Sequence, residues 1–437
     1  MNEPAMHEVL IAKLGERSAT VGIIGQGYVG LSVGLAAATA GLDVIGIDLD
    51  TDLITGLHDG RLAVPGVRDD AFEAGIATGR MTFDTDAARI AVADVILICV
   101  PTPVHEHRPD LTAVESAGTA ISRHLSPGTL VILESTTYPG TTERVLAPRL
   151  EAGGLTAGTD FMLAYSPERI DPGNDKFGFT DVPRVVGGMD PASTQAATAF
   201  YDLLVDVVHP VSSCRAAEMA KLLENTYRMV NIALVNELAM VCHDQGLSPW
   251  EVIDAAASKP FGFAKFVPGP GVGGHCIPID PTYLTWQSRR DTGRPYRLVE
   301  LANDINAEMP AYVTSRIADE LNELGRSLKG SRILALGVTY KPDVGDVRES
   351  AAIHVMTRLA RKGALVSFHD PFIDTVEDDG QRWQRTDLTA QTLAEADIVM
   401  LLTPHATYDL DWVADHAHHV FDARNAFDGP RDNVTIL

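Results

Sequence analysis

The sequence is poor in cysteine and in positive charge. Its 437 residues include four cysteines, Cys99, Cys214, Cys242 and Cys276, and no two of them form a Cys-x-x-Cys pair. Cysteines this sparse predict neither a disulfide framework nor a metal site, and they are typical of a cytoplasmic protein. Lysine and arginine number 35 against 59 acidic residues, a formal net charge of −24. Because that charge repels a phosphate backbone, we expect no nucleic-acid partner.

A long hydrophobic run is also missing. The strongest apolar stretches, 91–100 and 397–402, are far shorter than the roughly 20 residues that a membrane helix needs. The first twenty residues carry acidic side chains and no apolar core of signal-peptide length. We therefore expect no membrane partner and no secretory leader, and we interpret both stretches as buried strands.

Alternation of short apolar strands with helices is what the sequence has instead. A β-branched run over 19–24 leads through GQGYVG into an Ala- and Leu-rich helical stretch over 31–41, and a second strand follows at 43–48. This is the pattern of a βαβ unit in an open, doubly wound parallel sheet. Further strands of this sheet are predicted at 94–100, 129–134, 161–165 and 184–187.

The middle of the chain changes to helical spacing. Residues 216–245 predict one long helix, and Ser248-Pro249-Trp250-Glu251 predicts the start of a second, with a serine cap and a proline in the first turn. A Gly- and Pro-rich stretch over 268–281 interrupts, and we expect helices to resume near 297. A helix as long as the first could also serve as a dimer surface.

The α/β pattern returns near the C-terminus. A strand at 332–337, a helix at 351–362 and a strand at 364–369 are predicted, and residues 396–405 loosely repeat the pattern of 93–103. Any two parallel strands can look alike, so the repeat by itself is weak. The interpretation that we adopt is an α/β chain with two Rossmann-like doubly wound domains joined by a helical middle domain with a long central helix.

The glycine turn after the first strand predicts a dinucleotide site. Gly25, Gly27 and Gly30, with Tyr28 and Val29 between them, form GxGxxG between a strand and a helix, and Asp48 ends the next strand. The glycines permit a tight turn and close approach to a pyrophosphate at the helix N-terminus. Because a carboxylate binds ribose hydroxyls and repels a 2′-phosphate, the cofactor predicted is NAD. A glycine turn without ligand, or a non-enzymatic NAD sensor, would show the same motif.

Polar residues of the middle segment are candidates for chemistry. Lys221 and Asn225 are spaced to share one face of the long helix, although a solvated lysine and a surface asparagine would have the same spacing. Cys276 follows a loop with four glycines in six residues, and Asp280 comes four residues later. Nucleophilic cysteines occupy such loops, and a structural role remains equally open at this point.

Three further candidates follow strands of the first sheet. Glu168, Thr102 and Thr136 each come after a predicted strand, where ligands of open parallel sheets bind. A strand-end acid is more often a helix cap, so Glu168 alone does not establish a site.

Together these segments resemble the nucleotide-sugar 6-dehydrogenases that act on UDP-glucose, UDP-N-acetylglucosamine and UDP-N-acetylmannosamine. GQGYVGLS, VPTP, ESTTYPGTTE, YSPERIDPGN, EMAKLLENTYR, PGPGVGGHCIPIDP, TYKPDVGDVRES and DARN occur in the family's order over nearly the whole chain. The resemblance implies an NAD-binding Rossmann domain over 1–212, a helical central and dimerisation domain with the cysteine loop over 213–328, and a UDP-sugar-binding Rossmann-like domain over 329–437.

The resemblance also implies a four-electron oxidation of a primary alcohol to a carboxylate, with two NAD. Cys276 would form a thiohemiacetal and then a thioester, and Lys221 would stabilise the oxyanion. Asn225 would orient the substrate, Asp280 with Thr136 would position water, and Glu168 would do acid–base or water-handling work. Cofactor contacts are implied for Thr102, Thr136 and Arg348. Substrate contacts are implied for Glu168, Lys221, Asn225, Phe266, Gly273, Tyr340, Lys341 and Arg424.

The cysteine loop favours the N-acetylhexosamine branch. UDP-glucose enzymes typically carry Gly-Gly-Ser-Cys-Phe-Pro-Lys-Asp, whereas this chain has Gly-Gly-His-Cys-Ile-Pro-Ile-Asp. We expect UDP-GlcNAc as substrate, with UDP-ManNAc and then UDP-glucose as alternatives, and a homodimer or higher homo-oligomer. A two-electron β-hydroxyacid dehydrogenase and a non-catalytic NAD-binding regulator remain as other hypotheses.

Overall fold

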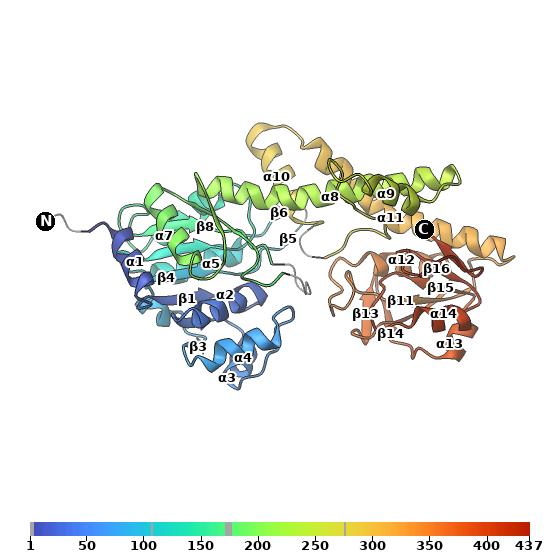
Figure 1. The fold of residues 1–437 in the computed structure, drawn as a ribbon, viewed down its shortest axis with the longest axis horizontal. Coiled ribbons are helices and arrows are strands. Elements are labelled where there is room, and N and C mark those ends of the chain that lie inside the picture. Colours follow the sequence, from blue (N-terminus) through green and yellow to red (C-terminus); the bar gives the residue numbers. More distant parts are fainter. Residues whose placement is uncertain (1–3, 106–107, 171–176, 275–276) are drawn as a thin grey trace. The chain divides into compact units, whose positions relative to one another are not determined.

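The computed structural model describes residues 4–105, 108–170, 177–274 and 277–437. The chain divides into two compact units, Met1–Glu224 and Asn225–Leu437, and each contains its own sheet with helices packed on it (Figure 1). The predicted fold class, Rossmann-like α/β domains with a helical middle, is confirmed. The predicted domain boundaries at 212 and 328 stay a prediction. Cys276 lies outside the described residues.

The first unit is built on an eight-stranded sheet. Its order is β10-β9-β8-β7-β4-β1-β2-β3, so the chain moves outward in both directions from neighbouring strands β1 and β4. Ligands of such sheets bind at this switch point, beyond the carboxyl ends of the strands. The strands are β1 (Thr20–Ile24), β2 (Asp43–Ile47), β3 (Met81–Asp84), β4 (Val95–Ile98), β7 (Leu130–Leu133), β8 (Met162–Tyr165), β9 (Arg184–Gly188) and β10 (Val208–Val211).

Alternate residues of each strand pack against helices on opposite faces of this sheet. Ile132 faces a core that includes α1, α2 and α7, while Val131 faces a core that includes α5, α6 and the start of α8. Both side chains are fully buried because the sheet is covered on both faces. The other elements of the unit are α1 (Met6–Gly15), α2 (Tyr28–Thr39), α3 (Thr51–His58), α4 (Asp69–Ala77), the 3₁₀-helix η1 (Ala87–Val92), the hairpin β5 (Val104–His105) and β6 (Arg108–Pro109), α5 (Thr112–Ser122), the π-helical turn η2 (Thr142–Leu146), α6 (Ala147–Glu151) and α7 (Pro191–Tyr201).

One side of the sheet departs from the expected parallel arrangement. β9 runs antiparallel to β8, with Tyr165 opposite Gly187 and Ala164 opposite Gly188, and β10 runs parallel to β9. An apolar run does not encode strand direction, so this reversal could not be predicted from the residues of β9. As a result the first residue of β9, Arg184, lies at the edge of the sheet where β8 ends.

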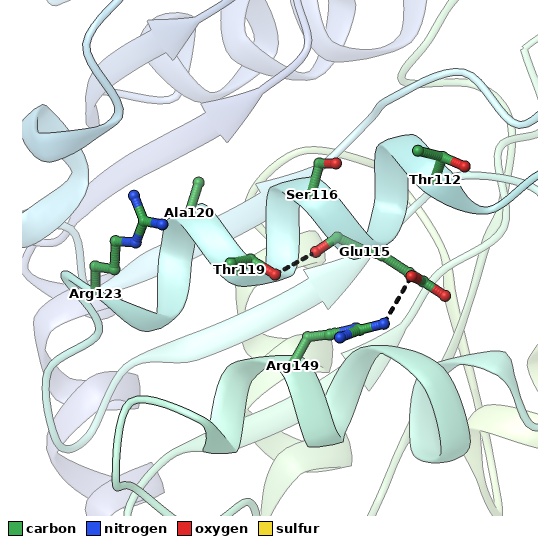
Figure 2. A pocket seen from close by; sticks show the side chains of 7 residues that line it. All are labelled: Thr112, Glu115, Ser116, Thr119, Ala120, Arg123 and Arg149. Carbon is green, nitrogen blue, oxygen red and sulfur yellow. Dashed lines mark hydrogen bonds and ion pairs between the residues drawn. The ribbon is translucent and has the colours of Figure 1, made fainter.

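A groove runs along the outer side of α5 (Figure 2). It is lined by seven residues of α5 and its neighbours, and Glu115 of α5 pairs with Arg149 of α6 at 2.8 Å. No predicted site residue is among those that line it in the described part of the chain. The lining residues are Thr112, Glu115, Ser116, Thr119, Ala120, Arg123 and Arg149.

Long helices occupy the middle of the chain, as the spacing predicts. They are α8 (Cys214–Asp244), α9 (Pro249–Ala257), α10 (Asp280–Thr292) and α11 (Arg297–Glu323). The Ser248 hydroxyl accepts a hydrogen bond from the Glu251 amide at 3.3 Å, so the predicted serine cap of α9 is confirmed. The expectation that helices resume only near 297 is wrong, because α10 begins at Asp280 with Pro281 in its first turn.

The second unit carries a five-stranded parallel sheet. Its order is β12-β11-β15-β16-β17, with α11 and α12 in the core on one face and residues from α13 and α14 in the core on the other. A hairpin of β13 and β14 follows β12 in the chain. The elements are β11 (Arg332–Leu336), α12 (Ala351–Arg361), β12 (Leu365–His369), β13 (Thr375–Asp378), β14 (Gln381–Gln384), α13 (Ala390–Glu395), β15 (Ile398–Leu401), α14 (Leu410–His416), β16 (Val420–Asp422) and β17 (Val434–Ile436).

An aspartate also follows the second strand of this sheet, but its surroundings differ from those of Asp48. Asp370 is fully buried and accepts hydrogen bonds from the Val338 amide at 2.7 Å and from the Phe372 amide at 2.9 Å. The His405 imidazole, also buried, places Nε2 at 3.0 Å from the same carboxylate. Hydrogen bonding from this ring helps to lower the pKa of Asp370 against the opposing effect of its burial.

None of the helices in the described parts of the chain combines the length and the apolar character needed to cross a membrane.

Candidate active site

The turn between β1 and α2 has no room for side chains at two of its three glycines. Gly25 has φ +95°, and a Cβ there would lie 2.5 Å from the carbonyl oxygen of Cys99. A Cβ at Gly30 would lie 1.9 Å from the carbonyl oxygen of Gly25. At Gly27, the N-cap of α2, a Cβ would meet no atom within 4 Å. The turn is therefore tight on its inner side and open where the helix begins, which is where a pyrophosphate binds.

Asp48 follows β2 directly beside this turn. Its Oδ2 accepts a hydrogen bond from the Gln26 amide at 2.7 Å, and its Oδ1 accepts one from the Asp50 amide at 3.0 Å. Each carboxylate oxygen keeps a second lone pair, and the side chain is half-buried. Asp48 is thus fixed in orientation and can still accept bonds from two ribose hydroxyls. Tyr28 and Val29, the remaining predicted cofactor residues of this turn, are half-buried in the first turn of α2.

The loops after β4 and β7 are tied together at the same edge of the sheet. The Thr102 hydroxyl donates to the Thr136 carbonyl at 2.8 Å, so the structure brings these two predicted residues together. The loop that contains Thr136 is anchored by Glu218 of α8, which accepts bonds from the amides of Gly140 at 2.5 Å and Thr142 at 2.9 Å. The sequence reasoning missed Glu218, which is fully buried. It also missed the buried hydroxyl of Thr137, which has no hydrogen bond among the described residues.

Glu168 and Lys221 also lie together. The Lys221 ammonium, on α8, donates to the main-chain carbonyl of Glu168, and both residues are almost fully buried. The Glu168 carboxylate accepts from the Ile170 amide through Oε1, while its Oε2 has no hydrogen bond among the described residues. The structure therefore brings the Lys221 ammonium to the main chain of Glu168, and groups of these two types are suited to oxyanion stabilisation and proton transfer.

A cluster that the sequence reasoning missed lies next to Glu168. Glu134, at the end of β7, and Arg184, at the start of β9, are both fully buried, and a guanidinium nitrogen lies 3.7 Å from the Glu134 carboxylate. Tyr201 of α7 donates its hydroxyl to Glu134. Burial raises the pKa of Glu134 to about 7, although the charge of Arg184 acts in the opposite direction. The rule that selected Glu168, an acid at a strand end, would have found Glu134 as well.

In the second unit the structure joins two predicted catalytic residues. The Asn225 amide donates to the Asp280 carboxylate at 2.5 Å, and both side chains are nearly fully buried. Asn225 lies on α8 and Asp280 is the first residue of α10. Cys276, which the sequence places four residues before Asp280, lies outside the described residues.

The glycine loop before Cys276 packs on the segment between β11 and α12. A Cβ at Gly273 would lie 2.6 Å from the Glu349 carbonyl oxygen and 2.9 Å from the Cβ of Tyr340. The Gly274 amide donates to the Arg348 carbonyl at 3.1 Å. Two predicted substrate residues, Gly273 and Tyr340, are therefore neighbours. The Arg348 side chain is exposed and paired with Asp346.

Arg424 lies near the start of the same loop. Its Nε donates to the Leu402 carbonyl at 3.0 Å, and a Cβ at Gly269 would lie 2.4 Å from one of its guanidinium nitrogens. Burial lowers the pKa of Arg424 to about 10, partly offset by Asp422, so the guanidinium is still charged at neutral pH. Lys341 is half-buried in the loop after β11, and the half-buried ring of Phe266 packs edge-on against Tyr227 at 5.7 Å.

In the part of the chain that the structure describes, no three His, Cys, Asp or Glu side chains are grouped as a metal ion would require.

The sequence matches, in order, the three domains that define one enzyme family. Residues 19–205 match the NAD binding domain of the UDP-glucose/GDP-mannose dehydrogenase family, residues 215–308 its central domain, and residues 334–429 its UDP binding domain. The chain belongs to this family. It is therefore an NAD-dependent nucleotide-sugar dehydrogenase, an oxidoreductase, and the tight glycine turn and Asp48 fit the NAD that the family's first domain binds.

Relatives in this family match the chain along most of its length. A UDP-N-acetyl-D-mannosamine dehydrogenase of Escherichia coli (strain K12) is 33% identical, over 94% of this chain and 99% of its own. A UDP-N-acetyl-D-glucosamine 6-dehydrogenase of Pseudomonas aeruginosa is 33% identical, over 89% and 91%. The solved structure of a UDP-D-ManNAc dehydrogenase from Pyrococcus horikoshii matches with a TM-score of 0.86 and 29% identity, covering 95% of this chain and 98% of that one.

Proposed function

We propose that this dehydrogenase oxidises the C6 hydroxymethyl group of a UDP-N-acetylhexosamine to the carboxylate, with UDP-GlcNAc as the first candidate. UDP-ManNAc and UDP-glucose are the alternatives. The observation that carries the proposal is the match to all three family domains, together with the Glu168–Lys221 and Asn225–Asp280 contacts. The cysteine loop favours the N-acetylhexosamine branch over UDP-glucose, while the relatives named for N-acetylglucosamine and N-acetylmannosamine are equally similar at 33% identity. The choice between these two sugars is therefore left to the experiment below.

The family match favours this function over the two others considered. A β-hydroxyacid dehydrogenase leaves the UDP binding domain at residues 334–429 without a task. Arg424 and Lys341 belong to that domain, and their charges suit a diphosphate in a protein of net charge −24.

The proposed chemistry proceeds on the protein's own thiol. The glycine turn and Asp48 would hold NAD at the first sheet, where it would supply the hydride acceptor for each of the two oxidations of C6. Glu168 takes the proton of the alcohol, and the thiolate of Cys276 adds to the resulting aldehyde as a thiohemiacetal. Loss of the second hydride leaves a thioester, and water then releases the carboxylate and restores the thiol. The covalent bond keeps the half-oxidised sugar in place between the two oxidations.

Side chains around C6 have separate tasks in this proposal. The Lys221 ammonium stabilises the negative charge that develops on the C6 oxygen, Asn225 orients the substrate, and Asp280 with Thr136 positions the water. The Asn225–Asp280 hydrogen bond supports this assignment because it fixes the amide by a buried carboxylate. Tyr340, Lys341, Arg424, Phe266 and Gly273 are proposed to contact the UDP-sugar, and Thr102 and Arg348 the cofactor.

The proposed function is tested by counting NADH per sugar consumed. UDP-GlcNAc, UDP-ManNAc and UDP-glucose are incubated side by side with excess NAD, and the products are analysed by mass spectrometry. We expect two NADH per sugar, a uronic acid product, and the highest kcat/KM for UDP-GlcNAc. One NADH per sugar with a stable aldehyde or ketone would refute the four-electron reaction.

The thioester step has its own test in Cys276→Ser. A serine alkoxide is a poorer nucleophile and leaving group than a thiolate, so we expect uronate formation to be nearly abolished, with an ester trapped on the protein and visible by mass spectrometry. Cys242→Ser, on the buried side of α8, is the matched control and should keep its turnover. Full turnover by Cys276→Ala would contradict the mechanism.

We also propose that the enzyme is a homodimer or a higher homo-oligomer that associates through α8. Large apolar side chains are exposed along this helix, including Leu223 and Leu234, each 60% exposed. Apolar rows of this kind are typical of interfaces. Light scattering should find a monomer for Leu234→Glu and an oligomer for the wild type, and an unchanged mass for the variant would refute this interface. The exposed apolar residues of α8 are Met219, Leu223, Tyr227, Leu234 and Val241.

A further inference from the structure

Three buried charged side chains meet where β7, β8 and β9 lie side by side. Glu134 directly follows β7, Glu168 comes three residues after β8, and Arg184 is the first residue of β9. Because β9 is antiparallel to β8, the pairing of Tyr165 with Gly187, continued by three residues, places Glu168 opposite Arg184. The reversed strand therefore supplies a cation at the sheet edge where the catalytic loops begin.

The cluster contains two carboxyl groups and one guanidinium. Glu134 is 0% exposed, Arg184 1% and Glu168 5%, and the guanidinium nitrogens lie 3.7 Å from Glu134 Oε2 and 3.9 Å from Glu168 Oε2. Two buried carboxylates with one counter-charge cost more than one carboxylate and one neutral acid, so one of the two holds a proton more readily. Burial raises the pKa of Glu134 to about 7.

Arg184 is held rigidly in this position. One of its guanidinium nitrogens donates to the carbonyl of Pro167, the residue before Glu168, at 3.3 Å. The guanidinium stacks 4.6 Å from the ring centre of Phe179 and 5.7 Å from that of Tyr201. Despite the opposing effect of its own burial, the carboxyl groups of Glu134 and Glu168 raise the pKa of Arg184, so it stays charged. It contacts both the main chain and the carboxylate of the segment that carries Glu168.

We infer that Arg184 and Glu134 are positioning residues for Glu168. Arg184 supplies a counter-charge to the Glu168 carboxylate at the sheet edge, and Glu134, held by the Tyr201 hydroxyl, is the member of the pair that takes up a proton. The groups that face Glu134 are Arg184, Glu168, Tyr201 and the thiol of Cys99 at the end of β4. The inference rests on the proposed function only in that Glu168 is the group that exchanges protons with substrate.

The kinetic test compares Arg184→Gln with Arg184→Lys. Without the guanidinium, we expect Arg184→Gln to lose about 100-fold in kcat, at the low end for a proton-transfer group. The acidic limb of its kcat–pH profile, where kcat falls as the pH is lowered, should shift to a pH about one unit higher, because Glu168 loses the charge of the guanidinium. The KM for NAD should be unchanged. Arg184→Lys, which restores the charge, should return the limb to the wild-type position even if part of the kcat loss remains.

A matched control removes a buried arginine from the other unit. Arg316→Gln takes away a guanidinium that is 7% exposed and is paired with Glu320, so it lowers stability without touching this cluster. Its acidic limb should coincide with that of the wild type. If Arg184→Gln kept the wild-type limb as well, Arg184 would be structural only and the inference would fail.

Infrared spectroscopy tests the protonation without turnover. The wild type should show protonated-carboxyl absorption that fades as the pH passes about 7, because burial raises the pKa of both Glu134 and Glu218 to about 7. The Glu134 component is the part of this absorption that is lost in Glu134→Gln. Arg184→Gln should gain an additional band, which disappears when Glu168→Gln is added. Unchanged absorption in Glu134→Gln, or no additional band in Arg184→Gln, would overturn the inference. These spectra decide it even if the wild type oxidises none of the three UDP-sugars, a result that would refute the proposed function instead.

Discussion

At the scale of single residues, we propose that Asp48 is the carboxylate through which the first unit recognises NAD. Asp48 is oriented by the amides of Gln26 and Asp50, so it need not reorganise to meet a ribose. Preorganisation of this kind converts most of a hydrogen bond's energy into affinity.

We expect Asp48→Ala to raise the KM for NAD by about 10- to 100-fold, the value of one or two charge-assisted hydrogen bonds. The KM for the UDP-sugar should stay within about twofold, as measured by initial rates with each substrate varied in turn. Asp50→Ala is the control, because that exposed carboxylate caps α3 instead. An equal rise in the KM for NAD in both variants would show that Asp48 acts only by shaping the loop.

Arg424 is the matching residue of the UDP binding domain. It is oriented by the Leu402 carbonyl and stays cationic, and we propose that it binds the anionic substrate. Arg424→Ala should raise the KM for the UDP-sugar by about 10- to 100-fold, since a hydrogen bond to a charged group is worth roughly 1.5 to 3 kcal/mol. Isothermal titration with UDP alone should show the same loss, whereas Arg431→Ala, whose partners are Asp411 and Asp415, should not change UDP affinity.

At the scale of elements, substitutions at two glycines of the turn between β1 and α2 should separate effects on folding from effects on NAD binding. A Cβ added at Gly30 would lie 1.9 Å from the carbonyl oxygen of Gly25, whereas a Cβ added at Gly27 would meet no atom within 4 Å. The same substitution should therefore have different effects at the two positions. Gly30→Ala should lower the free energy of unfolding by about 1 to 3 kcal/mol through overpacking. Gly27→Ala should melt as the wild type does and still raise the KM for NAD. Thermal melts and initial rates check both results, and a folding loss in Gly27→Ala would contradict the prediction.

Helices and strands with a strong local sequence pattern were predictable, but the direction in which a strand runs in the sheet was not. The βαβ start, α8 and the serine cap of α9 each carry periodicity or capping signals, and all are confirmed. The start of α10 at Asp280 was not predicted, because its first turn lies at the end of a Gly- and Pro-rich stretch. The reversal of β9 depends on which neighbours a strand pairs with, and no local pattern records that.

The candidate site was predictable to the same degree. Asp48, Glu168 and Lys221 could be proposed from the sequence because a motif, a strand end or a helical spacing marks each of them, and their roles stay predictions. Arg184 was missed because a single arginine at the start of an apolar strand has no such mark, and its meaning comes from the antiparallel pairing. Glu134 is the first residue of the ESTTYPGTTE segment, directly after a predicted strand, and could have been selected as a strand-end acid.

At the scale of the whole molecule, the buried acid Glu134 links stability to pH. Its pKa rises from 4.5 to about 7 on folding because of burial, so the folded protein binds more protons than the unfolded chain between these values. Its contribution to stability is complete below about pH 4.5 and is lost as the pH rises through about 7. The pKa values of the neighbouring Cys99, Arg184 and Tyr201 are all raised, so these groups titrate above this window.

We therefore expect the melting temperature of the wild type to fall by several degrees relative to Glu134→Gln between about pH 5 and pH 7.5. Glu115→Gln serves as the control, because this carboxylate is 40% exposed in a surface pair and should leave the wild-type slope unchanged. Calorimetric scans across the range measure the difference. Parallel curves for the wild type and Glu134→Gln would show that Glu134 does not change protonation on folding.

The hydrogen bonds of Asp370 bear on where NAD would bind during the two proposed oxidations. In the second sheet Asp370 follows the second strand, as Asp48 does in the first sheet. Its carboxylate, however, is hydrogen-bonded to His405 and to main-chain amides and is fully buried. No helix of the described chain starts at the end of β11 either, since α12 begins only at Ala351. This sheet thus lacks, in its described residues, the available strand-end carboxylate and the adjoining helix that the first sheet has. In the proposed four-electron reaction both hydrides would therefore go to NAD at the first sheet, and NADH would have to be replaced by NAD between the two oxidations. The proposed covalent bond to Cys276 would hold the half-oxidised sugar during that exchange.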